Sequence, residues 1–213
     1  MSIARAGWTV IARCLFSAAA GYIMCFYPAW RPGGLVVCAA GLIWALFAAY
    51  FFRDPQRPLP GDASKLYSPG DGRVLSIENE GEGDEVTIRI FLSIFNVHLQ
   101  RAPCAGTVED AEYIPGSFRA AMVPEARRNE RCVLRLSPEG HSGTVVVEQI
   151  AGLIARRIEC WKGAGDQVRA GERYGIIHFG SQVAVTLPVS TRVLVTVGDR
   201  VQAGITPIAS WTS

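Results

Sequence analysis

Histidine is the side chain best suited to proton transfer near neutral pH, and this chain has only three, His98, His141 and His178. His141 lies in a polar, glycine-rich turn sequence, which is typical of an exposed loop residue. His98 ends a strongly apolar stretch and stands in a polar cluster with Asn96 and Arg101. Both a structural hydrogen bond and general acid–base catalysis fit His98 at this point.

A second group of candidates surrounds Ser181, which follows Gly180 at the end of the apolar stretch 174–179. His178 lies just before this pair and could supply a base. Asp71 lies in the sequence Ser-Pro-Gly-Asp-Gly at 68–72, where an aspartate commonly stabilises a turn. The sequence has no G-x-S-x-G elbow, phosphate-binding loop or dinucleotide fingerprint, so these motifs indicate no other enzyme class.

The composition divides the chain into two parts. Residues 1–52 carry only three charges, all of them arginine, whereas the rest of the chain has the charge density of a soluble domain. This uneven distribution explains the positive mean hydropathy of +0.21. A formal net charge of +2 without a concentrated basic face argues against a nucleic-acid partner.

Two charge-free stretches, 14–30 and 32–52, are each long enough to span a membrane. Arg31, Pro32 and two glycines separate them, which favours two helices, at about 10–30 and 33–52, over one continuous helix. The arginines that flank this hairpin place both ends in the cytoplasm by the positive-inside rule. We therefore expect a hairpin domain, 1–52, in the cell (inner) membrane. A cleaved signal peptide or a buried soluble hairpin would be the alternative.

Residues 53–213 are expected to form one β-rich catalytic domain on the cytoplasmic side. Alternation at 85–93 and β-branched residues at 144–147 and 183–197 predict strands. Only residues 118–131 look helical. They would form a solvated surface helix or loop, or a basic segment that faces a membrane.

The sequence G-D-Q-V-R-A-G at 165–171 recurs as G-D-R-V-Q-A-G at 198–204. The glycines predict tight turns, and the valine predicts an inward anchor in each copy. This pattern resembles the turns of lipoyl-type domains. We therefore predict a mainly β fold, with a barrel-sandwich-like (lipoyl-type hybrid) domain after a two-helix transmembrane hairpin. Neither of the two lysines, Lys65 and Lys162, has the setting of a carrier attachment site.

The six cysteines are widely spaced and include no C-x-x-C pair, so no metal site is predicted. Reduced thiols in a cytoplasmic setting are expected.

A set of motifs, taken in order, resembles the short form of the phosphatidylserine decarboxylase family. The motifs are Phe-Phe-Arg-Asp-Pro at 51–55, Ser-Pro-Gly-Asp-Gly at 68–72, Phe-Asn-Val-His at 95–98, Asn-Glu-Arg at 129–131 and Phe-Gly-Ser at 179–181. The resemblance covers essentially the whole chain, and the ordered set is far more specific than any single motif.

The resemblance implies a proenzyme that cuts itself between Gly180 and Ser181. The products would be a large chain, 1–180, and a small chain, 181–213, that stay associated. Ser181 would become an N-terminal pyruvoyl group, the only cofactor implied, with no metal and no pyridoxal phosphate. This group would form a Schiff base with phosphatidylserine from the bilayer and release CO₂ to give phosphatidylethanolamine, a step of phospholipid biosynthesis.

The family roles carry over to most, but not all, positions. Asp71 matches the aspartate that assists self-cleavage, and His98 matches the first histidine of an H-x-x-H-x-P pattern, assigned to decarboxylation. Arg101 replaces the second histidine, so the Asp-His-Ser triad of longer members is incomplete. His98 or His178 could supply the base for cleavage, or Asp71 could act without a histidine. Arg101 and Asn96 could assist or bind substrate, or Arg101 could form a salt bridge.

Two other functions fit parts of the sequence. The repeated turns also suit a membrane-tethered adaptor or carrier without enzymatic activity. The second alternative function is a pyruvoyl-dependent decarboxylase that acts on a soluble amino acid. The hairpin would then be superfluous. The sequence is also compatible with association into a homo-oligomer.

Overall fold

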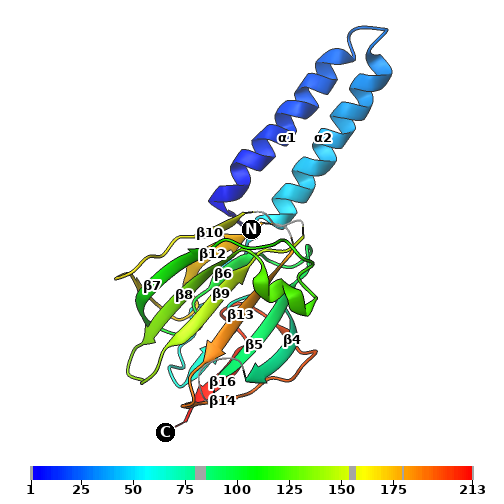
Figure 1. Cartoon of the computed structure of the whole chain (residues 1–213). Coiled ribbons are helices and arrows are strands. Elements are labelled where there is room, and N and C mark those ends of the chain that lie inside the picture. Colours follow the sequence, from blue (N-terminus) through cyan, green and yellow to red (C-terminus); the bar gives the residue numbers. More distant parts are fainter. Residues whose placement is uncertain (1, 80–84, 154–156, 179, 213) are drawn as a thin grey trace. The chain divides into compact units, whose positions relative to one another are not determined.

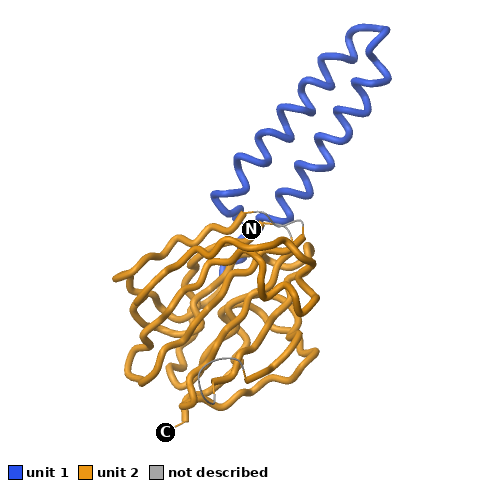
Figure 2. Tube along the Cα trace, in the orientation of Figure 1, with its two compact units in different colours: residues 1–56 blue, residues 57–213 orange. Residues whose placement is uncertain are grey.

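The computed structural model describes the whole chain except residues 1, 80–84, 154–156, 179 and 213 (Figure 1). It contains two compact units, residues 1–56 and residues 57–213 (Figure 2). The first unit is mainly helical, and the second consists mainly of strands.

The first unit is a pair of helices, α1 (Arg5–Met24) and α2 (Arg31–Phe51), with short strands β1 (Ser2–Ile3) and β2 (Arg53–Asp54) paired at its base. Small residues allow the helices to approach closely: a Cβ at Gly21 would lie 2.4 Å from the backbone nitrogen of Cys38. Large apolar side chains such as Phe16 and Leu46 point outward. Both helices are long and apolar enough to cross a membrane, as the sequence predicts, and they are consistent with membrane association.

The second unit contains a short 3₁₀ helix, η1 (Pro124–Arg128), and the strands β3 to β16. The strands are β3 (Lys65–Tyr67), β4 (Gly72–Asn79), β5 (Val86–Leu92), β6 (Leu99–Arg101), β7 (Gly106–Ile114), β8 (Arg131–Pro138), β9 (Val145–Ile150), β10 (Ile158–Cys160), β11 (Gln167–Val168), β12 (Arg173–Ile177), β13 (Ser181–Leu187), β14 (Thr191–Val193), β15 (Arg200–Val201) and β16 (Pro207–Trp211).

The described strands of this unit form three antiparallel sheets. The largest has the strand order β11-β7-β8-β9-β13-β5-β4-β15, and the smaller ones have the orders β10-β12-β6 and β14-β16-β3. The large sheet curls around a core of fully buried aliphatic side chains, among them Ile90, Leu136 and Val185 (Figure 1). The mainly β prediction is therefore confirmed. The finer assignment to a lipoyl-type hybrid stays a prediction.

The two repeats form the two edges of the large sheet. β11 belongs to the first copy and β15 to the second, and both anchoring valines, Val168 and Val201, are buried as predicted. The final glycines of the copies meet, because a Cβ at Gly204 would lie 3.1 Å from Cα of Gly171. The curled sheet thus brings its opposite edges together at the repeated turns.

Residues 118–131 form mostly an irregular loop, one of the structures that their sequence suggests, and not a continuous helix. Only η1 is helical, and Pro124 begins it. The flanking residues are held by a bridge between Ser117 and Asn129. Proline has no backbone N–H with which to continue a helix from the preceding residues, which explains why the helix begins at Pro124.

Candidate active site

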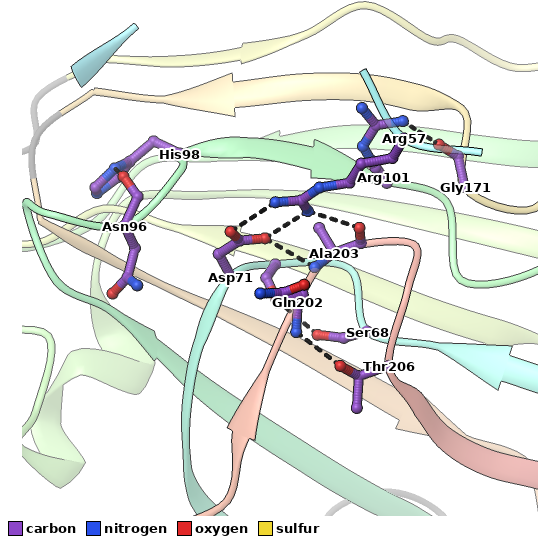
Figure 3. A network of polar contacts seen from close by, with 11 residues as sticks. Arg57, Ser68, Asp71, Asn96, His98, Arg101, Gly171, Gln202, Ala203 and Thr206 are labelled. Carbon is purple, nitrogen blue, oxygen red and sulfur yellow. Dashed lines mark hydrogen bonds and ion pairs between the residues drawn. The ribbon is translucent and has the colours of Figure 1, made fainter. Parts of the chain in front are cut away.

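His98 and Asn96 form one part of the site (Figure 3). His98 is fully buried, and its Nδ1 lies 3.1 Å from the carbonyl oxygen of Asn96. Because a carbonyl can only accept, Nδ1 carries the proton and Nε2 does not. Nε2 accepts a hydrogen bond of 3.3 Å from the backbone N–H of Gly180. The structure therefore brings the basic nitrogen of His98 to the predicted cleavage site.

Asn96 acts through its backbone as well as its side chain. Its Oδ1 accepts a hydrogen bond of 2.9 Å from the backbone nitrogen of Ser93. This contact closes the turn that follows β5 and fixes the carbonyl that orients His98. Asn96 is thus a positioning residue for the imidazole.

Ser181 begins β13 and is fully buried. Among the described residues, its Oγ has no hydrogen-bond partner, which is costly for a buried hydroxyl unless it has a chemical role. Gly180, just before it, has a φ of +62°, a conformation that strains other residues. The turn therefore places an unpaired hydroxyl directly after a glycine carbonyl.

A second loop supports this carbonyl. A Cβ at Gly152 would lie 2.1 Å from the carbonyl oxygen of Gly180, so the two backbones are in direct contact. Buried Asn129 holds this loop, because its Nδ2 donates to the carbonyl oxygen of Ala151 at 2.8 Å. Its Oδ1 also accepts from the backbone nitrogen of Arg119 at 2.8 Å. Sequence reasoning noted Asn129 only within a motif and missed Gly152, whose role depends on a contact distant in sequence.

Asp71 belongs to a separate network in Figure 3. Its carboxylate receives two hydrogen bonds from Arg57, of 2.7 and 2.8 Å, and a third from the backbone nitrogen of Ala203 at 2.8 Å. In the described part of the chain it contacts neither His98 nor Ser181 through a hydrogen bond. The turn of Asp71 nevertheless lies against β13, since a Cβ at Gly70 would lie 2.7 Å from Cγ1 of Val183.

Arg101 is buried and supports the meeting point of the repeats. Its Nη1 donates to the carbonyl oxygen of Gly171 at 2.8 Å, and its Cδ would lie 2.9 Å from a Cβ at Gly204. Arg101, Arg57 and Arg173 also line an open cleft of about 1030 Å³. The bond to Gly171 therefore favours a structural role for Arg101. The same side chain also lines the cleft, together with other arginines.

His178 faces Glu159. Its Nε2 lies 3.3 Å from Oε1 of Glu159. Burial lowers the pKa of His178 despite this carboxylate, because the imidazolium would lose its hydration. The structure thus joins His98, Asn96, Gly180 and Ser181, and places Asp71, Arg101 and His178 in other contacts.

Comparison with known proteins identifies the family. The family model for phosphatidylserine decarboxylase matches residues 44–209. A phosphatidylserine decarboxylase proenzyme of Symbiobacterium thermophilum is 42% identical over 212 residues, covering 97% of this chain and 94% of the relative. That of Paraburkholderia xenovorans is 39% identical over 214 residues, covering 97% and 96%. That of Desulfotalea psychrophila is 44% identical over 171 residues, covering 78% and 79%.

These matches confirm the resemblance found in the motifs. The relatives are named as proenzymes, which agrees with the expected processing of a precursor. They support an enzyme, and nothing in them favours an adaptor or carrier without activity. The chain belongs to the phosphatidylserine decarboxylase family, whose members are pyruvoyl-dependent decarboxylases.

Proposed function

We propose that this chain cuts its own Gly180–Ser181 bond and then decarboxylates phosphatidylserine held in a bilayer. One observation carries the proposal: the buried hydroxyl of Ser181, which has no hydrogen-bond partner among the described residues, follows a glycine whose backbone nitrogen donates to Nε2 of His98. A nucleophile and a proton acceptor thus lie on either side of one peptide carbonyl.

Self-cleavage begins with attack of Ser181 Oγ on the carbonyl carbon of Gly180. The C–O bond forms, the C–N bond breaks, and the nitrogen takes up the hydroxyl proton, which leaves an ester. Removal of the Cα proton of Ser181 then breaks the Cβ–O bond, and Gly180 leaves as a carboxylate. Addition of water and loss of ammonia convert the remaining unsaturated residue into the pyruvoyl group. His98 is positioned to accept and return protons in these steps.

The surroundings of Ser181 fit a pyruvoyl group. Residue 181 is fully buried, and β13 pairs with β5 on one side and β9 on the other. The small chain, 181–213, would therefore stay associated with the large chain after cleavage. The pyruvoyl group supplies an electron sink for loss of CO₂. His98, its Nδ1 proton fixed by Asn96, can hold a proton on Nε2 and deliver it to the product.

We propose that Asp71 assists cleavage indirectly, by fixing the turn that packs beside Ser181. The ion pair with Arg57 and the bond from Ala203 fix the 68–72 turn, and this turn packs against the beginning of β13. A fixed turn would hold Ser181 close to the attack geometry.

Three loops around the cleavage site expose large apolar side chains. Phe95 follows Ile94, which contacts Gly180; Met122 follows Ala121, whose carbonyl accepts from Gln182. Leu153 follows Gly152, whose backbone contacts the carbonyl oxygen of Gly180. The three side chains are 64%, 64% and 61% exposed, respectively.

We propose that this apolar rim, Phe95, Met122 and Leu153, touches the bilayer surface. Exposed Arg119 lies on the same loop as Met122, and exposed Arg128 ends η1, which follows that loop; both suit an anionic headgroup. A diacyl substrate could then present its headgroup to residue 181 while its acyl chains stay in lipid. The two apolar helices support an inner-membrane location, and their flanking arginines support a cytoplasmic catalytic unit.

The function is tested by CO₂ release from phosphatidylserine vesicles by the purified full chain, with Ser181→Ala as the inactive control. Release from phosphatidylserine but not from free serine supports the lipid substrate. Release from free serine alone would favour a soluble-substrate decarboxylase, and no release from either would reject both.

A further inference from the structure

Two buried glutamines form a hydrogen-bonded pair between two sheets. Gln100 lies on β6 of a smaller sheet and Gln149 on β9 of the large sheet. They are 0% and 1% exposed, and Nε2 of Gln149 donates to Oε1 of Gln100 at 2.9 Å. Gly175 of β12 leaves room for the pair, because a Cβ there would lie 2.6 Å from Nε2 of Gln149. The two amides are therefore closely packed in the interior.

The hydrogen bonds fix the orientation of each amide. Nε2 of Gln149 also donates to the backbone carbonyl oxygen of Glu159 at 3.4 Å, and a carbonyl can only accept. Gln149 therefore presents its amide nitrogen to Gln100, which accepts with its oxygen. Among the described residues, Nε2 of Gln100 and Oε1 of Gln149 have no hydrogen-bond partner. A buried amide nitrogen without an acceptor is costly unless a bound molecule supplies one.

Gln149 lies on the same face of the large sheet as Ser181. It is the register partner of Val183 in the pairing of β9 with β13. Ser181 lies two residues before Val183, and residues two apart on a strand point to the same face. The side chains of Gln149 and Ser181 are therefore diagonal neighbours, a relationship that puts such residues roughly 7–8 Å apart.

Gln100 lies on the same side of its strand as His98. The carbonyl oxygen of His98 accepts from the backbone nitrogen of Ile177, which continues the ladder between β6 and β12 by one residue. Gln100 follows His98 by two residues, so the two side chains face the same way. Because Nε2 of His98 accepts from the backbone of Gly180, the amide of Gln100 also faces the cleavage site.

We propose that Gln100 binds the carboxylate of the serine headgroup when the amino group of phosphatidylserine reaches residue 181, an inference that rests on the proposed function. Only the amino nitrogen and one carbon separate this carboxylate from the group at residue 181, a reach that suits a donor beside a diagonal neighbour. The same carbon also bears the phosphoester arm, so a carboxylate directed inward leaves the lipid directed toward the apolar rim. Gln149 is a positioning residue that orients the amide of Gln100.

Recognition of the carboxylate would separate the substrate from its product. Phosphatidylserine and phosphatidylethanolamine share the amino group and the phosphate, and differ by the carboxylate. A donor that contacts only the carboxylate strengthens binding of the substrate and leaves binding of the product unchanged. A neutral amide suits this task, because it orients the carboxylate without the full positive charge that would stabilise the ground state.

The test compares the wild-type full chain with Gln100→Met in detergent micelles that contain phosphatidylserine. We expect the KM for phosphatidylserine, from CO₂ release, to rise about tenfold or more with little change in kcat, the loss of one hydrogen bond to a charged group. The affinity for phosphatidylethanolamine is read by intact mass, as the adduct that sodium cyanoborohydride leaves on the small chain, and should stay unchanged. Gln149→Met should raise the KM less, in the same direction. An unchanged KM in Gln100→Met, or equal weakening for both lipids, would overturn the proposal.

Thr87→Val is the matched control. Thr87 is also buried and polar, and it pairs with Thr186, toward the other end of the β5–β13 pairing from Ser181. This variant should keep the wild-type values for both lipids, and a loss equal to that of Gln100→Met would count against the proposal. Failure of the proposed function would be seen separately, because the wild-type chain would then stay uncut or release no CO₂.

The wild-type enzyme decides the question if Gln100→Met does not fold. Half-maximal formation of the phosphatidylethanolamine adduct should then need about tenfold more lipid than the KM for phosphatidylserine, by the same hydrogen-bond energy. Equal values for the two lipids would show that the carboxylate is not recognised and would overturn the proposal.

Discussion

Nε2 of His98 lies 3.3 Å from the backbone nitrogen of Gly180, and it is the nitrogen that carries no proton. This relationship places a base one peptide unit from the proposed cleavage bond, Gly180–Ser181. Asp71, by contrast, is saturated by Arg57 and Ala203. The structure thus keeps His98 and Ser181, the proposed chemical groups, apart from the carboxylate of Asp71, which holds the neighbouring turn.

His98→Ala should slow self-cleavage by roughly 10²-fold, the usual contribution of one positioned acid–base group, and should also suppress CO₂ release. The measurement is the fraction of cut chain against time on a denaturing gel, followed by decarboxylation of vesicle lipid. Cleavage at the wild-type rate would remove His98 from maturation and leave it with decarboxylation alone.

His178→Ala should cleave at close to the wild-type rate, although His178 is nearer to Ser181 in sequence than His98. Its ring faces Glu159, and burial lowers its pKa. The same time course provides the comparison. If His178→Ala failed to cleave while His98→Ala cleaved normally, His178 and not His98 would be the base for self-cleavage.

Asp71→Asn should destabilise the catalytic unit by roughly 3 kcal/mol, because it leaves Arg57 without its charged partner in a largely buried site. Slower cleavage should accompany this loss. Thermal unfolding and cleavage rates of Asp71→Asn, Arg57→Met and the double variant form the test. Their effects should be strongly non-additive, and simple addition would show that the two residues act independently.

Phe95→Ser combined with Leu153→Ser should lower kcat/KM for phosphatidylserine in vesicles several-fold, while self-cleavage and turnover of a short-chain, soluble phosphatidylserine stay unchanged. The control is Val189→Ser with Val197→Ser, since these residues are 63% and 62% exposed and lie outside the rim loops. Equal losses on both substrates, or equal losses in the control, would argue against bilayer contact.

Local patterns predicted much of this protein. Charge-free stretches identified the helices, alternation identified β5, and the repeated motif located the buried Val168 and Val201. The motif Phe-Asn-Val-His also led to His98, because a polar cluster at the end of a strand is visible in sequence.

The remaining features depend on contacts between distant segments. Nothing near Asp71 in the sequence reveals that Arg57, from the preceding linker, will bind both carboxylate oxygens. The approach of Gly152 to Gly180 is likewise a tertiary contact. The basic stretch 118–131 suggested a helix, but Pro124 and the buried amide of Asn129 favour a short 3₁₀ turn and an irregular loop.

The central claim, conversion of Ser181 by self-cleavage, is tested most directly by the intact mass of the purified wild-type protein. The account predicts two fragments, 1–180 and 181–213, the smaller with a pyruvoyl group in place of its N-terminal serine. The Ser181→Ala chain should remain whole. A single wild-type chain of 23.1 kDa with an unmodified Ser181 would contradict the account.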